Sequence, residues 1–505
     1  MKSVGVIASG SRSFYAPILI YKEAEKDLVE EALAVVRDRV TRKEYLGIVR
    51  GLSKIDPLLP ATQRSGVVDN PKLAEVATSV PFENSYIKIL GELRDGRLEP
   101  PRDPPTPRSE IYLVESPEDV KLDLGQGLAV GSHKYSDIEI PLVPIYLPYH
   151  IGIVGATGTG KSRLVRALVD EVTEKTDWKV LVFDHSGVDY VPYYGKQRVV
   201  DASLVMPDPI TLGQLISKMI RYDNEDHVVL SIYAYIANKI KPRERVKTLV
   251  GVKQSQQEST CDVDIVKNFD FTHVEKLMIK IDWDVNSFVS CIEEVGERFN
   301  VRESTIARVE LMLRTYARKF VNSLGKKKLT TADIVDRVFS ERLVVVDLST
   351  VELVVRRYIV KSAIDKLWEI VDERGEKPRT LVVIDEAHNY ACYQCKDSLE
   401  SIERTAREGR KWDIGLALSS QRVIDFSTDV RNNVNTYFFS RLQTPGDFDN
   451  LKGVLDLGGI GADSISALGV REFFFAGLGN PLKLPILIKV REVGESSPAG
   501  GNVNN

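Results

Sequence analysis

The sequence predicts an α/β protein with a parallel-sheet core, a helical insertion and a small N-terminal β-rich domain. From about residue 110, apolar strand-like runs alternate with helix-like segments, which is typical of a parallel sheet. Between residues 203 and 340 the strand signal fades and helical periodicity dominates. Residues 1–98 instead hold short β-like runs separated by turn residues, which indicate a barrel or sandwich.

The N-terminal domain is expected to be a β-barrel over residues 1–98, with a helix near residues 24–38. Its strand-like runs include 4–8, 15–21, 46–49 and 86–91. Residues 99–108, EPPRDPPTPR, hold five prolines, which cannot pair inside a sheet. We therefore expect a stiff proline-rich linker over 99–109.

The core is expected in two parts, residues 110–202 and 341–492, with the helical insertion at 203–340 between its second and third strands. A flexible tail is expected over 493–505. Strand candidates are 151–154, 178–183, 343–347, 380–385, 414–419, 436–440, 471–476 and 485–490. The basic residues of the insertion form a solvated face or, as the less favoured alternative, a nucleic-acid surface. They are Lys239, Lys241, Arg243, Arg245, Lys247 and Lys326–Lys328.

Composition limits the function classes. The 505 residues are 43% hydrophobic and 28% charged, with a net charge of −4, so a global basic field for nucleic acid is absent. A ring protein could still confine its basic groups to a channel. We find no 18-residue apolar run and expect no membrane-spanning segment. The N-terminus has the pattern of a strand and not of a signal peptide, so a cytoplasmic location is expected.

The cysteine count indicates a reducing compartment, in which disulfides are not expected to carry the fold. The four cysteines are Cys261, Cys291, Cys392 and Cys395. The C-x-x-C pair at 392 and 395 is either a metal or redox site or, as we favour, two cysteines on a helix or loop.

Residues 155–162, GATGTGKS, fit the phosphate-binding pattern G-x-x-x-x-G-K-[ST] at every fixed position. An apolar strand precedes the loop and a helix follows it, so backbone N–H groups and the positive end of the helix would face a phosphate. Lys161 would reach the β- and γ-phosphates of ATP, and Ser162 would hold Mg²⁺. The residues expected at the nucleotide are Gly155, Ala156, Thr157, Gly158, Thr159, Gly160, Lys161, Ser162 and Arg163.

A second acidic strand end would complete the site. Residues 380–388 read TLVVIDEAH, so a buried strand delivers Asp385 and Glu386 to the edge of the sheet beside the phosphates. Asp385 would bind Mg²⁺ and Glu386 would act on the attacking water as a general base. The alternative is a pair that caps the next helix.

Three further positions follow the same logic. Gln421, at the end of the strand 414–420, would sense the γ-phosphate or orient water. The arginine run RTAREGRK at 404–411 is either a solvated helix end or the source of an arginine that reaches a neighbouring subunit's nucleotide. Asp184, at the end of a strand, would face the nucleotide or form an Asx-type turn.

Taken together, these motifs resemble the HerA-type hexameric DNA translocases and helicases of the FtsK–HerA group of RecA-like motors. The resemblance rests on GATGTGKS (155–162), FDHSG (183–187), VVIDEAHNY (382–390), RTAREGRK (404–411) and LALSSQR (416–422), in that order. It implies a RecA-like core and a homo-hexamer with DNA in the central channel. It also implies a NurA-like nuclease partner in DNA-end processing, and presentation of Arg410 to the neighbouring subunit.

Three positions depart from the family pattern. Tyr149 stands where the family has an arginine before His150, Ser186 stands where it has a histidine, and Val188 stands where it has a glutamate. These departures indicate a divergent archaeal paralogue.

The leading hypothesis is an ATP-driven DNA translocase or helicase, with residues 389–397 either a channel loop or, as we favour, a plain connector. One alternative is a membrane-docked ATPase for DNA transfer, as in conjugation and secretion systems. The other is an ATP-binding switch or scaffold with little turnover.

Overall fold

The computed structural model describes residues 1–56, 59, 66–70, 72, 82–240 and 261–494. Its described part divides into two compact units, which are treated separately. Unit 1 comprises residues 1–178, 379–388 and 405–495, and unit 2 comprises 179–378, 389–404 and 496–505. The tail beyond 494 and the predicted basic residues Lys241, Arg243, Arg245 and Lys247 lie outside the described residues.

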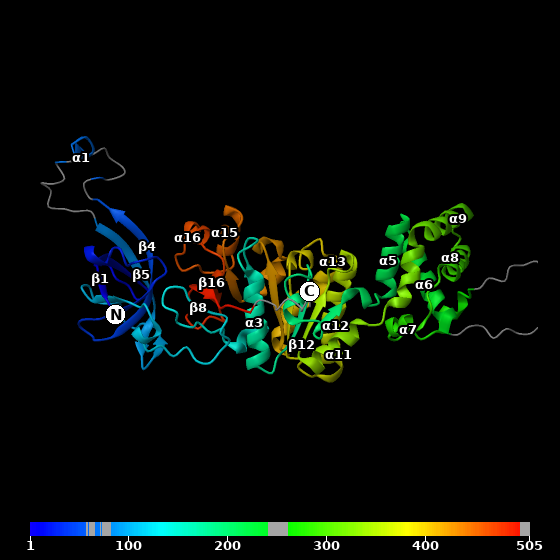
Figure 1. Cartoon of the computed structure of the whole chain (residues 1–505), viewed down its shortest axis with the longest axis horizontal. Helices are drawn as coiled ribbons and strands as arrows, with labels where there is room; N and C mark the ends of the chain where they lie inside the picture. Colours follow the sequence, from blue (N-terminus) through cyan, green and yellow to red (C-terminus); the bar gives the residue numbers. More distant parts are fainter. Residues whose placement is uncertain (57–58, 60–65, 71, 73–81, 241–260, 495–505) are drawn as a thin grey trace, which may run out of the picture. The chain divides into compact units, whose positions relative to one another are not determined.

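The N-terminal part of unit 1 is an antiparallel barrel closed by six strands, with a seventh short strand at its margin (Figure 1). The strand order is β2-β1-β7-β3-β4-β5-β6, and pairing of β2 with β5 closes the barrel. The strands are β1 (Ser3–Ile7), β2 (Tyr15–Ile20), β3 (Leu33–Arg37), β4 (Glu44–Ile55), β5 (Phe82–Arg94), β6 (Arg97–Glu99) and β7 (Glu110–Leu113).

The helix predicted near residues 24–38 is wrong. Only the 3₁₀ turn η1 (Lys22–Ala24) forms there, and β3 occupies 33–37. The apolar residues of β3, Leu33 to Val36, are all buried, and the strand pairs with both β4 and β7. A buried strand with partners on both sides outweighs the weak helical periodicity of this segment.

The proline-rich segment is not a free linker, and the barrel does not end before it. Strand β7 pairs with β1 and β3, so the barrel includes residues predicted to begin the core. The segment lies on the barrel, because Arg108 donates its N–H to Ile7 O at 2.7 Å and Ser11 Oγ contacts Pro105 O. Prolines remove ladder donors, but they do not prevent a strand from re-entering the sheet after them.

Asp38 joins the proline-rich segment to the barrel. Its buried carboxylate accepts hydrogen bonds from the N–H groups of Thr41, Thr106 and Val40 at 2.8, 2.6 and 2.9 Å. Burial raises the pKa of Asp38, but these hydrogen bonds outweigh it and lower the pKa to about 2.

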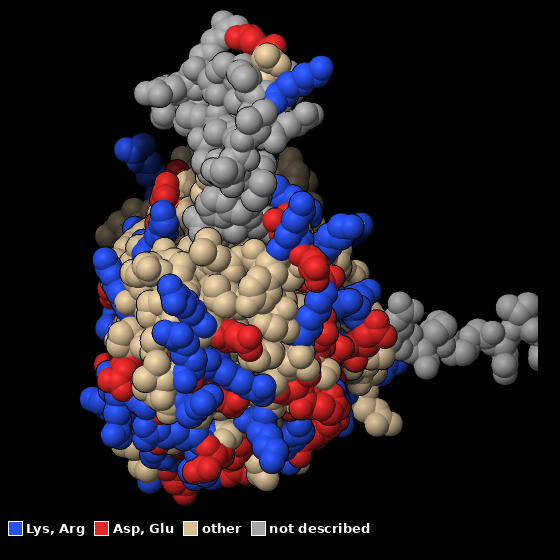
Figure 2. Space-filling model, turned by 90° about the vertical axis from the view of Figure 1, so that its left-hand side faces the viewer, with Lys and Arg blue, Asp and Glu red and all other residues tan. Residues whose placement is uncertain are grey.

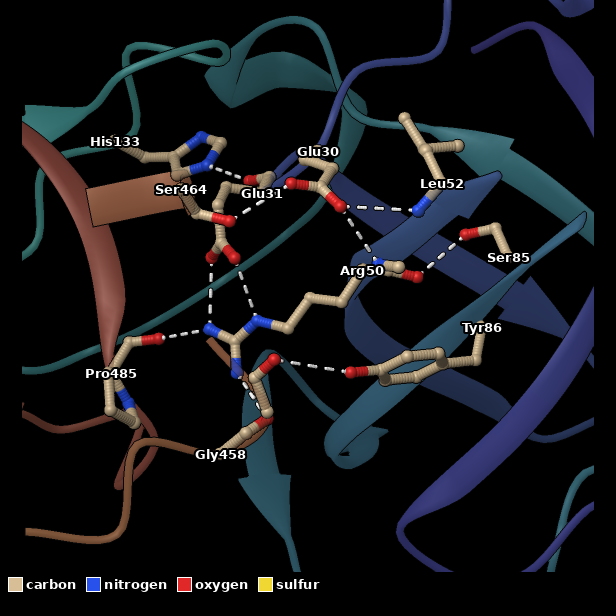
Figure 3. A network of polar contacts seen from close by, with 12 residues as sticks. Glu30, Glu31, Arg50, Leu52, Ser85, Tyr86, His133, Gly458, Ser464 and Pro485 are labelled. Carbon is tan, nitrogen blue, oxygen red and sulfur yellow. Dashed lines mark hydrogen bonds and ion pairs between the residues drawn. The ribbon is translucent and has the colours of Figure 1, made fainter. Parts of the chain in front are cut away.

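The barrel is joined to the rest of unit 1 by a buried ion pair, shown in Figure 3. Arg50 of β4 is 2% exposed, and its Nε and Nη2 donate to the two carboxylate oxygens of Glu31, both at 2.9 Å. Two further N–H groups donate to Gly458 O at 2.6 Å and to Pro485 O at 2.8 Å. Four of the five N–H groups of the buried guanidinium therefore have protein oxygens as acceptors.

His133 adds a second contact to this network. Burial lowers its pKa to about 4, so the ring is neutral. Its Nε2–H therefore donates to Glu31 O at 2.8 Å, and its Nδ1 accepts from Ser136 Oγ at 2.8 Å. His133 belongs to β8 (Gly131–His133) of the second sheet of unit 1, so a residue of that sheet binds the same glutamate as Arg50 (Figure 3).

The second sheet of unit 1 has seven strands in the order β13-β14-β9-β15-β16-β17-β8. The first four are parallel and the last three pair antiparallel. Helix α3 (Lys161–Lys175) packs on β9, β14 and β17. The strands are β8 (Gly131–His133), β9 (Ile151–Val154), β13 (Thr380–Ile384), β14 (Ile414–Ser420), β15 (Thr436–Phe439), β16 (Glu472–Gly477) and β17 (Ile486–Val490).

Around these strands lie short helices. They are η3 (Pro144–Tyr149), η9 (Gly409–Trp412), η10 (Val423–Asp425), α14 (Thr428–Asn433), α15 (Pro445–Lys452) and α16 (Ala462–Ser466). The turn η2 (Pro117–Asp119) instead lies at the barrel, where Asp119 pairs with the N-terminus at 3.3 Å. The predicted parallel α/β core is confirmed, and each strand candidate of the core matches an observed strand to within one or two residues.

Unit 2 contains three parallel strands in the order β11-β12-β10, followed along the chain by helical segments. The strands are β10 (Lys179–Asp184), β11 (Val199–Asp201) and β12 (Leu343–Asp347). The sequence did not predict β11, which is only three residues long. The long helix α12 (Leu353–Arg374) follows β12, and α13 (Lys396–Glu408) spans the boundary of the two units.

The predicted insertion is helical throughout its described part, apart from a single bridge between Val205 and Leu329. Its core is a cluster of apolar side chains that includes Ile232, Phe288 and Trp283. The helices are α5 (Pro209–Ile220), α6 (Glu225–Ile240), α7 (Val274–Lys280), α8 (Val285–Arg298), α9 (Glu303–Met312), α10 (Arg318–Ser323) and α11 (Thr331–Glu341).

Two disulfides are present in a chain whose sequence predicts that disulfides do not carry the fold. Cys261, the first residue described after 241–260, pairs with Cys291 of α8. Cys392 pairs with Cys395. A low cysteine count does not prevent pairing when the fold brings the residues to bonding distance. Within the described residues, no helix has the length and apolar character needed to cross a membrane.

The buried Asp38 predicts a pH dependence of stability. Its folded pKa lies below the unfolded value, so its stabilisation of about 2 kcal/mol is present above about pH 4 and is lost as the pH falls toward 2. Asp38→Asn should therefore lower the free energy of unfolding at pH 6, and the gap to wild type should narrow by pH 3. Urea denaturation followed by circular dichroism measures this, with the exposed turn residue Asp95→Asn as control. A gap that stays constant over this pH range would contradict the assignment.

Candidate nucleotide site

The phosphate-binding loop connects β9 to α3 in unit 1. All four residues of β9 are buried, and α3 begins at Lys161. Gly158 and Gly160 have φ angles of 80° and 98°, in the left-handed region that favours glycine. A Cβ at Gly160 would also lie 3.3 Å from Arg471 N. The glycines of the motif are thus required both by backbone conformation and, at 160, by close packing.

Three neighbouring chain segments support the loop. Gly155 N–H donates to Ser420 O at 3.3 Å, and Ala156 N–H donates to Arg441 O at 2.7 Å. Thr159 O accepts from Arg471 N at 2.8 Å. The loop is therefore fixed in shape by β14, by the second residue after β15 and by the residue before β16. Sequence analysis missed Arg441 and Arg471, because their backbone groups make the contact and leave no motif.

Lys161 lies inside the loop that it follows. Its Nζ donates to Gly155 O at 2.8 Å and to Ala156 O at 3.3 Å, and the side chain is 9% exposed. The ammonium group is therefore placed against the concave side of the glycine turn. This is the position from which a P-loop lysine reaches the β- and γ-phosphates.

The acidic pair follows β13 directly. Asp385 is 4% exposed, and Glu386 is half-buried with a φ of 45°. Left-handed backbone is uncommon for a residue with a long side chain. A Glu386 carboxylate oxygen lies 3.2 Å from His388 Nδ1. The alternative of a simple capping pair does not explain this backbone, since no long helix begins at these residues.

Strand register brings the motifs to one edge of the sheet. Val154 pairs with Ser420, and Ile384 pairs with Leu418 on the other side of the same strand. The residues that follow, Gly155, Gln421 and Asp385, therefore emerge at the same carboxyl edge, with β14 between β9 and β13. Ligands bind at this edge of parallel sheets. The structure thus brings together the P-loop, the acidic pair and the glutamine, as predicted.

Gln421 is held by a second glutamine. Its Oε1 accepts from Gln443 Nε2 at 3.0 Å, and the neighbouring Arg422 pairs with buried Asp447 at 2.9 Å. These contacts link the end of β14 to the start of α15. Gln443 was not identified from the sequence, because a lone glutamine after a strand carries no motif.

The arginines of the 404–411 run have different environments. Arg407 pairs with Asp429 at 2.8 Å, within unit 1. Arg404, which belongs to unit 2, pairs with Asp372 at 3.1 Å and stacks on Trp368. Arg410 is exposed, and its guanidinium carbon lies 5.1 Å from the centre of the Tyr149 ring. Among the described residues, no carboxylate lies within ion-pairing distance of Arg410, so its charge is available to a ligand or partner.

Asp184 and the segment 389–397, both of unit 2, have structural contacts. The buried carboxylate of Asp184 accepts from the N–H groups of Ser186 and Gly187 at 3.1 and 2.8 Å, which is the Asx-type turn weighed above. Its nucleotide contact stays a prediction. Across 389–397, Cys392 bonds to Cys395, Tyr390 is buried and Tyr393 is 61% exposed.

The donor set fits Mg²⁺ held jointly with a nucleotide. Asp385 supplies a buried carboxylate, and Ser162 supplies a hydroxyl in the first turn of α3. Within the described residues, no group of three or more His, Cys, Asp or Glu side chains could hold a metal by itself. A Mg²⁺ ion with few protein ligands, completed by phosphates and water, matches this arrangement.

Comparison with known proteins agrees with this geometry. Residues 128–367 match the family model described as "Helicase HerA, central domain". The "Probable helicase MJ1565" of Methanocaldococcus jannaschii is 27% identical over 80% of this chain and 75% of its own length. The "DNA double-strand break repair helicase HerA" of Sulfolobus acidocaldarius is 23% identical over 92% of this chain and 91% of its own length. The protein of the same name from Pyrococcus furiosus is 24% identical over 88% and 84%.

The loop geometry predicts the effect of one added methyl group. Gly160→Ala places a Cβ 3.3 Å from Arg471 N at a φ of 98°, which costs an L-residue about 1–2 kcal/mol before any steric strain. We expect ATP affinity to fall about ten-fold, measured by titration with a fluorescent ATP analogue. Gly325→Ala is the control, because that position is open and has no left-handed backbone. Equal affinities for the two variants would contradict the predicted role of the turn.

Proposed function

We propose that the chain is a P-loop ATPase of the HerA helicase type, and that it is an ATP-driven motor that moves on DNA. The observation that carries the proposal is the meeting of P-loop, acidic pair and glutamine at one sheet edge, in the same unit as an exposed, unneutralised Arg410. A protein that only binds nucleotide needs the loop. The other groups serve hydrolysis and its coupling to a partner.

The proposed chemistry is attack of water on the γ-phosphate of ATP. Glu386, fixed by its left-handed backbone, accepts the proton of the attacking water. Lys161 neutralises charge on the β- and γ-phosphate oxygens, and Gln421 orients the water or senses the γ-phosphate. Ser162 and Asp385 would hold Mg²⁺, which supplies charge neutralisation at the phosphates when bound. The products are ADP and inorganic phosphate.

Arg410 is proposed to act in trans. An arginine that stabilises transition-state charge must be free of a carboxylate partner, and Arg410 meets this condition whereas Arg407 does not. The proposal includes a homo-hexameric ring in which each Arg410 reaches a neighbouring subunit's nucleotide. It also includes DNA in the channel and a NurA-like nuclease as partner in DNA-end processing.

The surface charge agrees with a DNA path inside an assembly. On the face drawn in Figure 2, Lys and Arg side chains are interspersed with Asp and Glu around an uncharged central area. Several barrel cations are paired, including Lys43 with Asp103 and Arg37 with Glu44. This face offers no continuous basic field, so the proposal places DNA elsewhere.

The first test is turnover. Glu386→Gln removes the proposed base without changing side-chain size, so DNA-stimulated ATP hydrolysis should fall at least about 100-fold. Nucleotide affinity should stay within about two-fold of wild type. Steady-state phosphate release, with and without duplex DNA, measures the hydrolysis rates of wild type and variant. Equal and negligible rates in wild type and variant would instead support a low-turnover switch.

The second test asks whether Arg410 acts on another subunit. Arg410→Ala should lower hydrolysis about 10³-fold or more if it stabilises transition-state charge. Lys161→Ala should abolish nucleotide use while keeping Arg410 intact. Mixing the two inactive variants under subunit exchange should restore part of the activity, because the Lys161→Ala subunit can supply its arginine to the other's site. No recovery in assemblies shown to be mixed would refute action in trans.

A further inference from the structure

We propose that Tyr149 is a positioning residue for Arg410. We also propose that the segment 147–150, which leads into the P-loop strand β9, holds the turn η9 that carries this arginine. The inference deepens the proposed function and rests on it, because it assigns a purpose to Arg410. The observation behind it is independent of any motif. It is the contact between an exposed guanidinium and an aromatic ring one residue away from the buried His150.

The ring of Tyr149 is fixed before it meets the arginine. Tyr149 is the last residue of η3, and the ring of Tyr146 packs edge-on against it at 5.4 Å. Its carbonyl accepts from Asn435 N–H at 3.1 Å, which joins it to the residue before β15. The Arg410 guanidinium carbon lies 5.1 Å from the ring centre, within the range of a cation–π contact.

His150 also holds the turn η9, through hydrogen bonds to residues on either side of it. The ring is 1% exposed, and burial lowers its pKa to about 4, so it is neutral. Leu416 N–H donates to its Nδ1 at 3.1 Å, which assigns the remaining proton to Nε2. Nε2–H then donates to Ala406 O at 3.0 Å. One side chain thus joins the start of β9 to the last turns of α13 and to β14.

The turn that bears Arg410 has no room to shift. A Cβ at Gly409 would lie 2.5 Å from Ile414 O and 3.5 Å from His150 Cε1. A Cβ at Gly415 would lie 2.5 Å from Leu147 O. Backbone therefore packs against backbone on both sides of η9, and the position of Arg410 Cα is set by the segment 147–150.

An aromatic partner suits an arginine that must act elsewhere. A carboxylate, such as Asp429 beside Arg407, would neutralise the positive charge that a transition state requires. The ring of Tyr149 orients the guanidinium and leaves its charge intact. An exposed cation–π contact favours one orientation by about two- to five-fold, weak enough for release to a phosphate.

The arrangement also places Arg410 and the P-loop on the two ends of one short strand. Residues 149–150 hold the arginine turn, four buried residues of β9 follow, and the loop begins at Gly155. Because β9 is rigid and buried, a shift of the P-loop is transmitted to residues 149–150, which hold the turn that carries Arg410. The nucleotide site of each subunit is thereby linked to Arg410 of the same subunit, which is proposed to reach the neighbouring subunit's nucleotide.

The test uses the full-length protein with duplex DNA and saturating ATP. Tyr149→Leu should lower the hydrolysis rate about two- to five-fold, while Tyr149→Phe, which keeps the ring, should match wild type. Own-site nucleotide affinity and melting temperature should be unchanged in both. In the Arg410→Ala background, Tyr149→Leu should have no further effect. Tyr316→Leu, a change at an exposed tyrosine of unit 2, is the control and should be silent.

The outcomes separate the inference from the proposed function. A large loss in Arg410→Ala with an unaffected Tyr149→Leu would overturn the inference alone. Independent, multiplicative losses in the double variant would also overturn it, since the two residues would not act together. A silent Arg410→Ala would refute both proposals. If Tyr149→Leu does not fold, Tyr149→Met replaces it, because it keeps bulk without an aromatic ring.

Discussion

The buried charge of Arg50 is the constraint on which the arrangement of unit 1 depends. A guanidinium that is 2% exposed needs acceptors for its N–H groups, and here Glu31 of the barrel and the carbonyls of Gly458 and Pro485 accept from four of the five. The barrel and the segment 458–485 therefore fit together in the placement that completes this network. The same segment contains Arg471, whose N–H supports Thr159 of the P-loop. The barrel is thus connected to the nucleotide site through backbone that this buried network helps to hold.

Much of the core and of the candidate site could be predicted because their signals are local. A strand such as 380–384 is a continuous apolar run, and its acidic end is the next two residues of the chain. The P-loop is a contiguous motif, and its Gly158 and Gly160 are favoured by their own left-handed φ angles. Parallel strands place their carboxyl ends together, so Gly155, Asp385 and Gln421 could be assigned to one edge without knowing any distance.

What the sequence did not predict depends on contacts distant along the chain. β3 was expected to be helical, because its pairing with β7 over 70 residues later is invisible locally. The disulfide between Cys261 and Cys291 joins segments 30 residues apart. His150 is one of six histidines and belongs to no catalytic pattern, yet it joins three elements. Arg441 and Arg471 contribute backbone atoms, which no side-chain pattern records. Tyr149 was noticed only as a departure, whereas its ring contacts the one arginine of the run that stays unneutralised in unit 1.

The return of β7 to the barrel bears on how such proteins can exchange modules. A chimera joined within the proline-rich segment would give the recipient a barrel lacking one of its six closing strands. β1 and β3 would then present unpaired edges, which recruit strands from other chains. The donor would keep β7 without either partner. A junction after residue 113 preserves the closed barrel, so the natural unit of inheritance extends beyond the prolines that seem to mark its end.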